Sequence, residues 1–84
     1  MTKDNTYNGW KNYEIWNVAL WINNDEGLYY MAKEFMTDYK GRTPYADFVE
    51  YLESCEIYKT GDNVKFSDSR LSKQELNVML KELR

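Results

Sequence analysis

Apolar residues recur at helical spacing in four stretches of the chain, and polar or turn-forming residues separate these stretches. The pattern predicts helices over 13–23, 25–40, 44–55 and 73–83. The second stretch is the clearest, because its apolar and aromatic residues fall at steps of three and four along one face: Leu28, Met31, Ala32, Phe35, Met36 and Tyr39. The first stretch has a wider apolar sector, which is typical of a central helix packed on more than one side.

Residues that favour helix starts stand before each of these stretches. Asparagine, serine and threonine accept hydrogen bonds from free N–H groups of a first helical turn. Pro44 stands at the first helical position of the third stretch, and Glu75 completes a capping box in the fourth. The predicted N-caps are Asn12, Asn24, Thr43 and Ser72.

The segment 56–71 has no helical period. Thr60-Gly61-Asp62-Asn63 is a turn signal between two short apolar runs, so a two-strand hairpin over 57–66 is one alternative. A lone hairpin is only marginally stable, and we therefore expect a structured loop. The sequence predicts one all-α domain over 1–84, a bundle of about four helices with one long loop and a mobile start at 1–7.

Aromatic residues make up 17% of the chain, which gives a small core large and rigid units to pack. Trp16 and Trp21 are five positions apart and point to different sides of the first helix, so we expect one in the core and the other at a surface groove. Tyr29 and Tyr30 flank the apolar stripe of the second helix, and at least one must be exposed. The predicted core includes Trp16, Leu20, Leu28, Met31, Phe35, Phe48, Leu52, Leu76 and Leu80.

The chain has no histidine and a single cysteine, Cys55. Zinc sites need about four nitrogen or sulfur ligands, and nucleophilic pairs need a histidine base, so the sequence excludes both. The four glycines are scattered and form no phosphate loop. We expect no enzyme activity, no metal and no cofactor. The apolar run around Val18–Ile22 is far shorter than the ~20 residues of a membrane span, and an unpaired cysteine suits a reducing cytoplasm.

The formal charge is −3, and acidic residues concentrate in the middle of the chain. Asp47, Glu50 and Glu53 step by three along the predicted third helix, so they cover a broad face without converging. This face is either simply solvated or meets a basic protein partner. The last predicted helix carries a mostly basic row of side chains. This row is either a solvated face or a weak indication of nucleic-acid binding, and its residues are Lys73, Asn77, Lys81 and Arg84.

The segment NGWKNYEIWNVALWINNDEGLY, residues 8–29, resembles a family of short proteins from phages and bacterial mobile elements. These proteins begin with Asn-Gly-Trp-x-Asn-Tyr-Glu-x-Trp-Asn and continue with Leu-Trp-Ile-x-Asn-Asp-Glu-Gly-Leu-Tyr. Ile15 departs from the pattern, which has threonine there. The tail of the chain matches more loosely. The family has no established enzymatic activity, so the resemblance implies no catalytic residue. It implies phage or mobile-element cargo in a bacterial cytoplasm.

Small acidic proteins in that setting are often inhibitors of host defence. By this analogy we expect a protein-binding, anti-CRISPR-like inhibitor that binds a defence effector such as a CRISPR–Cas component and occludes its nucleic-acid site. The alternatives are a nucleic-acid-binding accessory protein that uses the basic last helix, or a structural phage component that self-assembles. The expected partner contacts are Asp47, Glu50, Glu53, Tyr29, Tyr30 and Tyr51.

Overall fold

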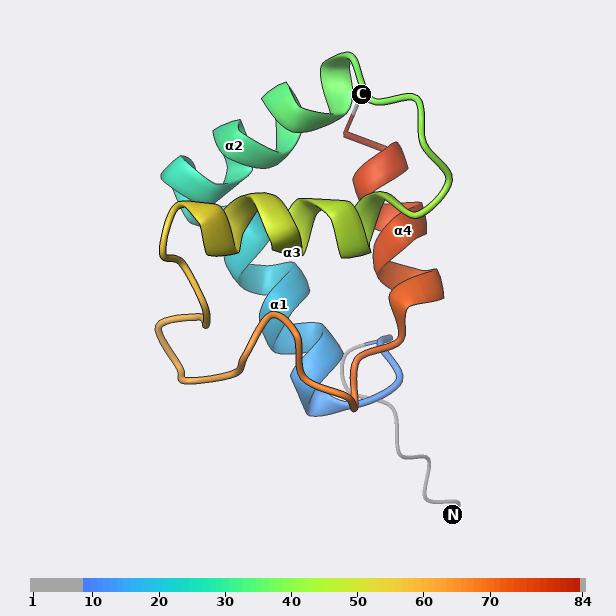
Figure 1. Cartoon of the computed structure of the whole chain (residues 1–84). Coiled ribbons are helices and arrows are strands. Elements are labelled where there is room, and N and C mark those ends of the chain that lie inside the picture. The colour runs from blue at the N-terminus through green and yellow to red at the C-terminus, as the bar shows by residue number, and fades with distance from the viewer. Residues whose placement is uncertain (1–8, 84) are drawn as a thin grey trace.

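A computed structural model describes residues 9–83 and confirms a small all-α domain (Figure 1). The predicted mobile start at 1–7 lies outside the described residues. No strand occurs among residues 9–83, and none of their helices has the length and apolar character of a membrane span. The four helices are α1 (Tyr13–Asn24), α2 (Glu26–Thr37), α3 (Pro44–Ser54) and α4 (Lys73–Lys81).

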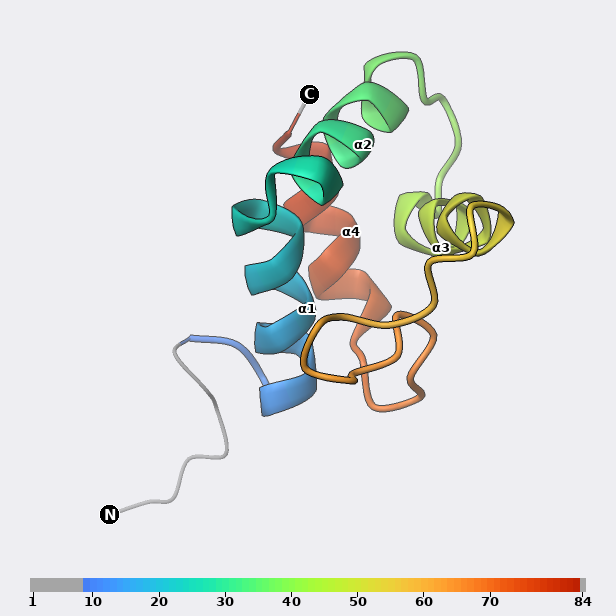
Figure 2. The ribbon, with the colours of Figure 1, turned by 90° about the vertical axis from the view of Figure 1, so that its left-hand side faces the viewer.

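The helices surround a core that the long loop between α3 and α4 completes. α4 contacts the other three helices, whereas α1 and α3 do not pack directly on each other. Figure 2 shows α4 between α1 and α3, α2 across the top, and the loop passing below between α1 and α3. The loop therefore occupies a position that a helix would take in a regular bundle.

Side chains of Asn and Asp begin the first two helices. Asn12 Oδ1 accepts a hydrogen bond from the Ile15 N–H at 2.9 Å, which confirms the predicted cap of α1. The predicted cap of α2 is wrong, because α1 continues through Asn24. Asp25 caps α2 instead, and its carboxylate accepts from the Leu28 N–H at 3.0 Å. A single residue thus separates α1 from α2 and turns the chain sharply.

The start of α3 is capped from another helix. Thr43 precedes α3 as predicted, but its side chain makes no capping hydrogen bond. Asn77 Oδ1 from α4 accepts from the Tyr45 N–H at 2.7 Å and satisfies one of the free donors. Asn77 is therefore part of the α3–α4 contact and does not belong to a free polar row on α4. The predicted cap of α4 is confirmed, since Ser72 Oγ accepts from the Glu75 N–H at 3.3 Å.

The core draws on all four helices and on the loop. Five of the predicted core residues are buried, and Met31 and Phe35 are partly buried against the core. Leu20 and Trp16 were predicted wrongly: Leu20 is 37% exposed, and Trp16 is half-buried outside the core, whereas Trp21 packs against it. The buried hydrophobic residues are Ile15, Val18, Ala19, Ile22, Leu28, Ala32, Met36, Tyr45, Phe48, Val49, Leu52, Val64, Phe66, Leu71, Leu76, Met79 and Leu80.

The segment 57–66 is a structured loop, as predicted, closed by one antiparallel bridge between Lys59 and Lys65. It does not form the two strands of the alternative hairpin. The loop inserts Val64 and Phe66 into the core. The buried hydroxyl of Tyr45 donates to the carbonyl oxygen of Phe66 at 2.6 Å, which ties the loop to α3.

A buried amide ties the same loop to α1. Asn17 is fully buried, and its Nδ2 donates to the Asp62 carboxylate at 2.8 Å. Its Oδ1 accepts from the Thr60 hydroxyl at 2.7 Å. The Trp21 indole N–H donates to the same Asp62 oxygen at 3.0 Å. A buried polar group stabilises a fold only when it is hydrogen-bonded, and here both ends of the amide are.

Substituting Gly61 tests this contact between loop and helix. A Cβ on Gly61 would overlap the six-membered ring of Trp21, and the indole hydrogen bond to Asp62 keeps that ring from moving aside. We expect Gly61→Ala to lower the free energy of unfolding by about 1–3 kcal/mol in urea denaturation. Gly27→Ala is the matched control. A Cβ there meets Asp25 at an ordinary 3.5 Å inside α2, so this variant should be as stable as the parent or more so. Equal effects of the two variants would contradict the contact.

The charge of Asp62 makes the loop contact dependent on pH. Hydrogen bonds from Trp21 and then Asn17 lower the pKa of Asp62 in the folded state. Because the pKa of Asp62 is lower in the folded state, its charged carboxylate stabilises the fold at any pH above the unfolded-state pKa of about 3.9. This stabilisation is lost as the pH falls through the folded-state pKa. We expect Asp62→Asn to reduce the melting temperature at pH 7, and the difference from the parent to shrink below about pH 4. A difference that stays constant from pH 7 to pH 2.5 would show that the carboxylate charge plays no part.

Candidate functional site

A row of aromatic rings crosses the junction between α2 and α3. Phe35 is at its centre, with ring centroids 5.3 Å from Tyr39 and 5.7 Å from Tyr51, both stacked. Phe48 lies 5.4 Å from Phe35 and is fully buried, whereas Tyr51 is 39% exposed. We call these four residues the aromatic seam. The seam runs from the core to the surface, so its outer rings are both firmly packed and accessible.

Asp47 holds one end of the aromatic seam in place. The hydroxyl of Tyr39 donates to the Asp47 carboxylate and accepts from the Thr43 N–H at 3.2 Å. Burial and then the bond to Asp47 raise the pKa of Tyr39, so its hydroxyl stays protonated as a donor. α2 ends at Thr37 instead of at residue 40, so Tyr39 makes these contacts from the chain beyond the helix.

The other two predicted acidic contacts are more exposed than Asp47. Glu50 and Glu53 lie on the outside of α3, and each step of three turns the helix face by about 60°. Asp47 therefore stands beside the aromatic seam, and Glu50 points outward. Glu53 is turned further from the seam than Glu50. None of the three makes an ion pair with the described residues, whose ion pairs all involve Arg70.

The structure does not bring Tyr29 and Tyr30 to this surface. Their rings contact each other at 5.6 Å, and Tyr30 is 58% exposed. Phe35 marks the side of α2 that meets α3, and the helical spacing places Tyr30 on the outer face and Tyr29 on the opposite flank. Of the predicted contacts, only Tyr51 and Asp47 lie together, with Glu50 next to them.

Phe35 and Tyr39 complete the site, but the sequence did not single them out. Both lie on the apolar stripe of the second helix, so they were indistinguishable from core residues. Their spacing of four on a helix was the available signal, because residues at that spacing share a face. Only the packing of α3 shows that this face continues to the surface.

The acidic side chains of the described residues do not gather around one point. Within residues 9–83 no three Cys, Asp or Glu side chains come together as a metal ion would require. On α3, Asp47 is bonded to Tyr39, whereas Glu50 and Glu53 are exposed and point in different directions.

Comparison with known proteins gives a family and no activity. The chain matches no curated protein and no solved structure. The pattern of a family of unknown function, DUF7249, matches residues 3–84. Because this match spans nearly the whole chain, the protein belongs to the family of unknown function DUF7249.

Proposed function

We propose that the chain is a non-catalytic protein-binding module that uses the aromatic seam and the neighbouring acidic residues of α3. Its partner is a host protein with a basic surface that otherwise holds nucleic acid. The resemblance of residues 8–29 to phage and mobile-element proteins makes a bacterial defence effector, such as a CRISPR–Cas component, the partner class that we put forward. Occlusion of that basic surface would inhibit the effector.

The observation that carries the proposal is the exposed edge of the aromatic seam beside unpaired carboxylates. Interface energy is concentrated in a few packed anchors, among which Tyr is common. Tyr51 is such an anchor, because stacking on Phe35 holds its ring before a partner arrives. Glu50 next to it supplies charge that speeds association with a basic surface and orients the complex.

The basic residues of the C-terminal part support direct nucleic-acid binding less well. The Arg70 guanidinium already contacts the carboxylates of Asp68 at 2.7 Å and Glu14 at 3.0 Å. Its side-chain and backbone hydrogen bonds lower the pKa of Asp68 to about 2, so this pair stays charged at neutral pH. Phosphate affinity requires cations that are free to replace counterions, and on α4 these are Lys73 and Lys81.

A charge reversal beside the seam tests the proposal. After co-purification from the bacterial host and identification of the partner, association is measured with purified proteins by biolayer interferometry at two salt concentrations. Glu50→Lys should slow association several-fold and reduce its salt dependence, because a steering charge is reversed. Tyr51→Ala should weaken binding about tenfold or more, because a packed anchor is lost. The parent should also compete with nucleic acid for the partner.

Glu26→Lys is the matched control, because it makes the same change of charge on the exposed first turn of α2, away from α3. Circular dichroism establishes that all variants are folded. If Glu26→Lys and Glu50→Lys slow association equally, or if Tyr51→Ala binds as the parent does, the seam is not the interface.

A further inference from the structure

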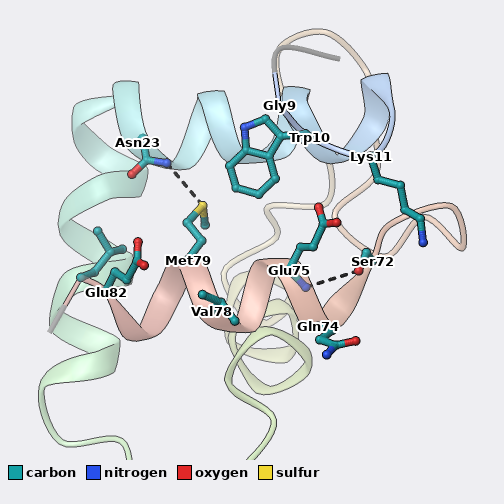
Figure 3. A pocket seen from close by; sticks show the side chains of 11 residues that line it. Gly9, Trp10, Lys11, Asn23, Ser72, Gln74, Glu75, Val78, Met79 and Glu82 are labelled. Atoms are coloured by element: carbon teal, nitrogen blue, oxygen red, sulfur yellow. Dashed lines mark hydrogen bonds between the residues drawn. The ribbon is translucent and has the colours of Figure 1, made fainter. Parts of the chain in front are cut away.

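A hollow lies between α1, α4 and residues 9–11. It has a volume of about 860 Å³, within the range of pockets that hold drug-sized ligands. Figure 3 shows Trp10 on one wall and Met79 and Val78 on the other, with Glu75 between Trp10 and Ser72. We call this hollow the α1–α4 groove. It is distinct from the aromatic seam, because α4 separates it from α3 (Figures 2 and 3).

The α1–α4 groove contains an unsatisfied acceptor. Glu75 Oε1 is buried, and no hydrogen bond reaches it from the described residues. Buried polar atoms without partners are rare in folded proteins, since each loses its hydration without replacement. Lys11 also lines the groove but is exposed and makes no ion pair with residues 9–83. Glu75 therefore lines the groove with a carboxylate of which one oxygen, Oε1, has no donor among the described residues.

The apolar wall of the groove is also incomplete. Val78 is 53% exposed although it stands on a packed helix, and Trp10 is only partly buried. The Asn23 amide is already engaged, because it donates to Met79 Sδ at 3.3 Å and to the Ala19 carbonyl at 2.9 Å. What remains for an occupant is an apolar strip next to the Glu75 carboxylate.

We propose that the α1–α4 groove binds an extended segment of another protein that inserts an arginine toward Glu75 and an apolar side chain against Val78. A cationic donor complements the unpaired carboxylate, and Glu82 at the rim adds negative charge. Arginine fits better than lysine, because its planar group can also stack on the indole of Trp10 and is more weakly hydrated. The groove runs along the chain from Ser72 to Leu83, so its length suits a segment of several residues better than one side chain.

The test uses the dipeptide N-acetyl-leucyl-arginine amide as a probe. Its binding to the full chain is followed by NMR through the Trp10 indole signal and the amides of α4. The neutral isostere with citrulline in place of arginine should bind about fivefold more weakly, as loss of a charge-assisted hydrogen bond predicts. Glu75→Gln should weaken the arginine probe to a similar extent and abolish the preference over citrulline.

Two further variants keep the test decisive if Glu75→Gln unfolds. Val78→Lys changes an exposed position and should repel the probe, and Glu26→Gln, outside the groove, should leave binding unchanged. Equal binding of the two probes, or signal changes confined to residues outside the groove, would overturn the proposal. So would a dimer in sedimentation that Val78→Lys dissociates, because the groove would then hold a second copy of the chain. None of these outcomes depends on the aromatic seam.

Discussion

The fully buried amide of Asn17 is the contact on which the arrangement of the helices depends. α1 and α3 do not pack on each other, so the loop that follows α3 must hold the space between them. That loop has one ladder bridge and no helix, and its own backbone bonds cannot fix it on the core. Val64, Phe66 and the Tyr45 hydroxyl hold the loop to the core and to α3. On the α1 side the Asn17 amide holds it, because it bonds both the Thr60 hydroxyl and the Asp62 carboxylate. The Thr60 hydroxyl in turn accepts from two backbone N–H groups of the loop, so one side chain of α1 organises the whole turn.

The position of the loop also determines which side of α1 becomes surface. Asn17 is polar but buried because the loop covers it, whereas apolar Leu20, three residues later, is 37% exposed. Trp21 packs under Gly61 for the same reason, whereas Trp16 lies outside the core on the side of α1 that carries Leu20. A helix with apolar residues on several sides carries no local information about which side the rest of the chain will cover. This is why the period and cap of α1 were predictable from sequence but the burial of Leu20 and Trp16 was not.

The same distinction separates the predictable and unpredictable parts of the candidate site. Asp47, Glu50 and Tyr51 are adjacent on one helix, so their proximity followed from helical spacing alone. Tyr29 and Tyr30 were placed near them only by assumption, and the orientation of α2 puts them elsewhere. The bond between Tyr39 and Asp47 could not be foreseen, because α2 ends at Thr37 and Tyr39 reaches Asp47 from the chain beyond the helix. Asn77 is a comparable case, since a residue of α4 caps α3 only when the two helices are packed.

Exposed aromatic rings alone are weak evidence for binding in a domain of this size. A chain of 84 residues has a high ratio of surface to volume and cannot enclose every large ring. Among the described residues only Tyr45, Phe48 and Phe66 are fully buried aromatics. Tyr30 and Tyr58, at 58% and 55% exposure, can be accounted for by this geometric limit. The aromatic seam differs because its rings are held by stacking and by the Tyr39–Asp47 bond, so a partner would meet a preorganised surface and lose little conformational entropy on binding. The α1–α4 groove differs in another respect. Its buried acceptor, Glu75 Oε1, lacks a donor and so destabilises the fold, and the small size of the domain does not explain this.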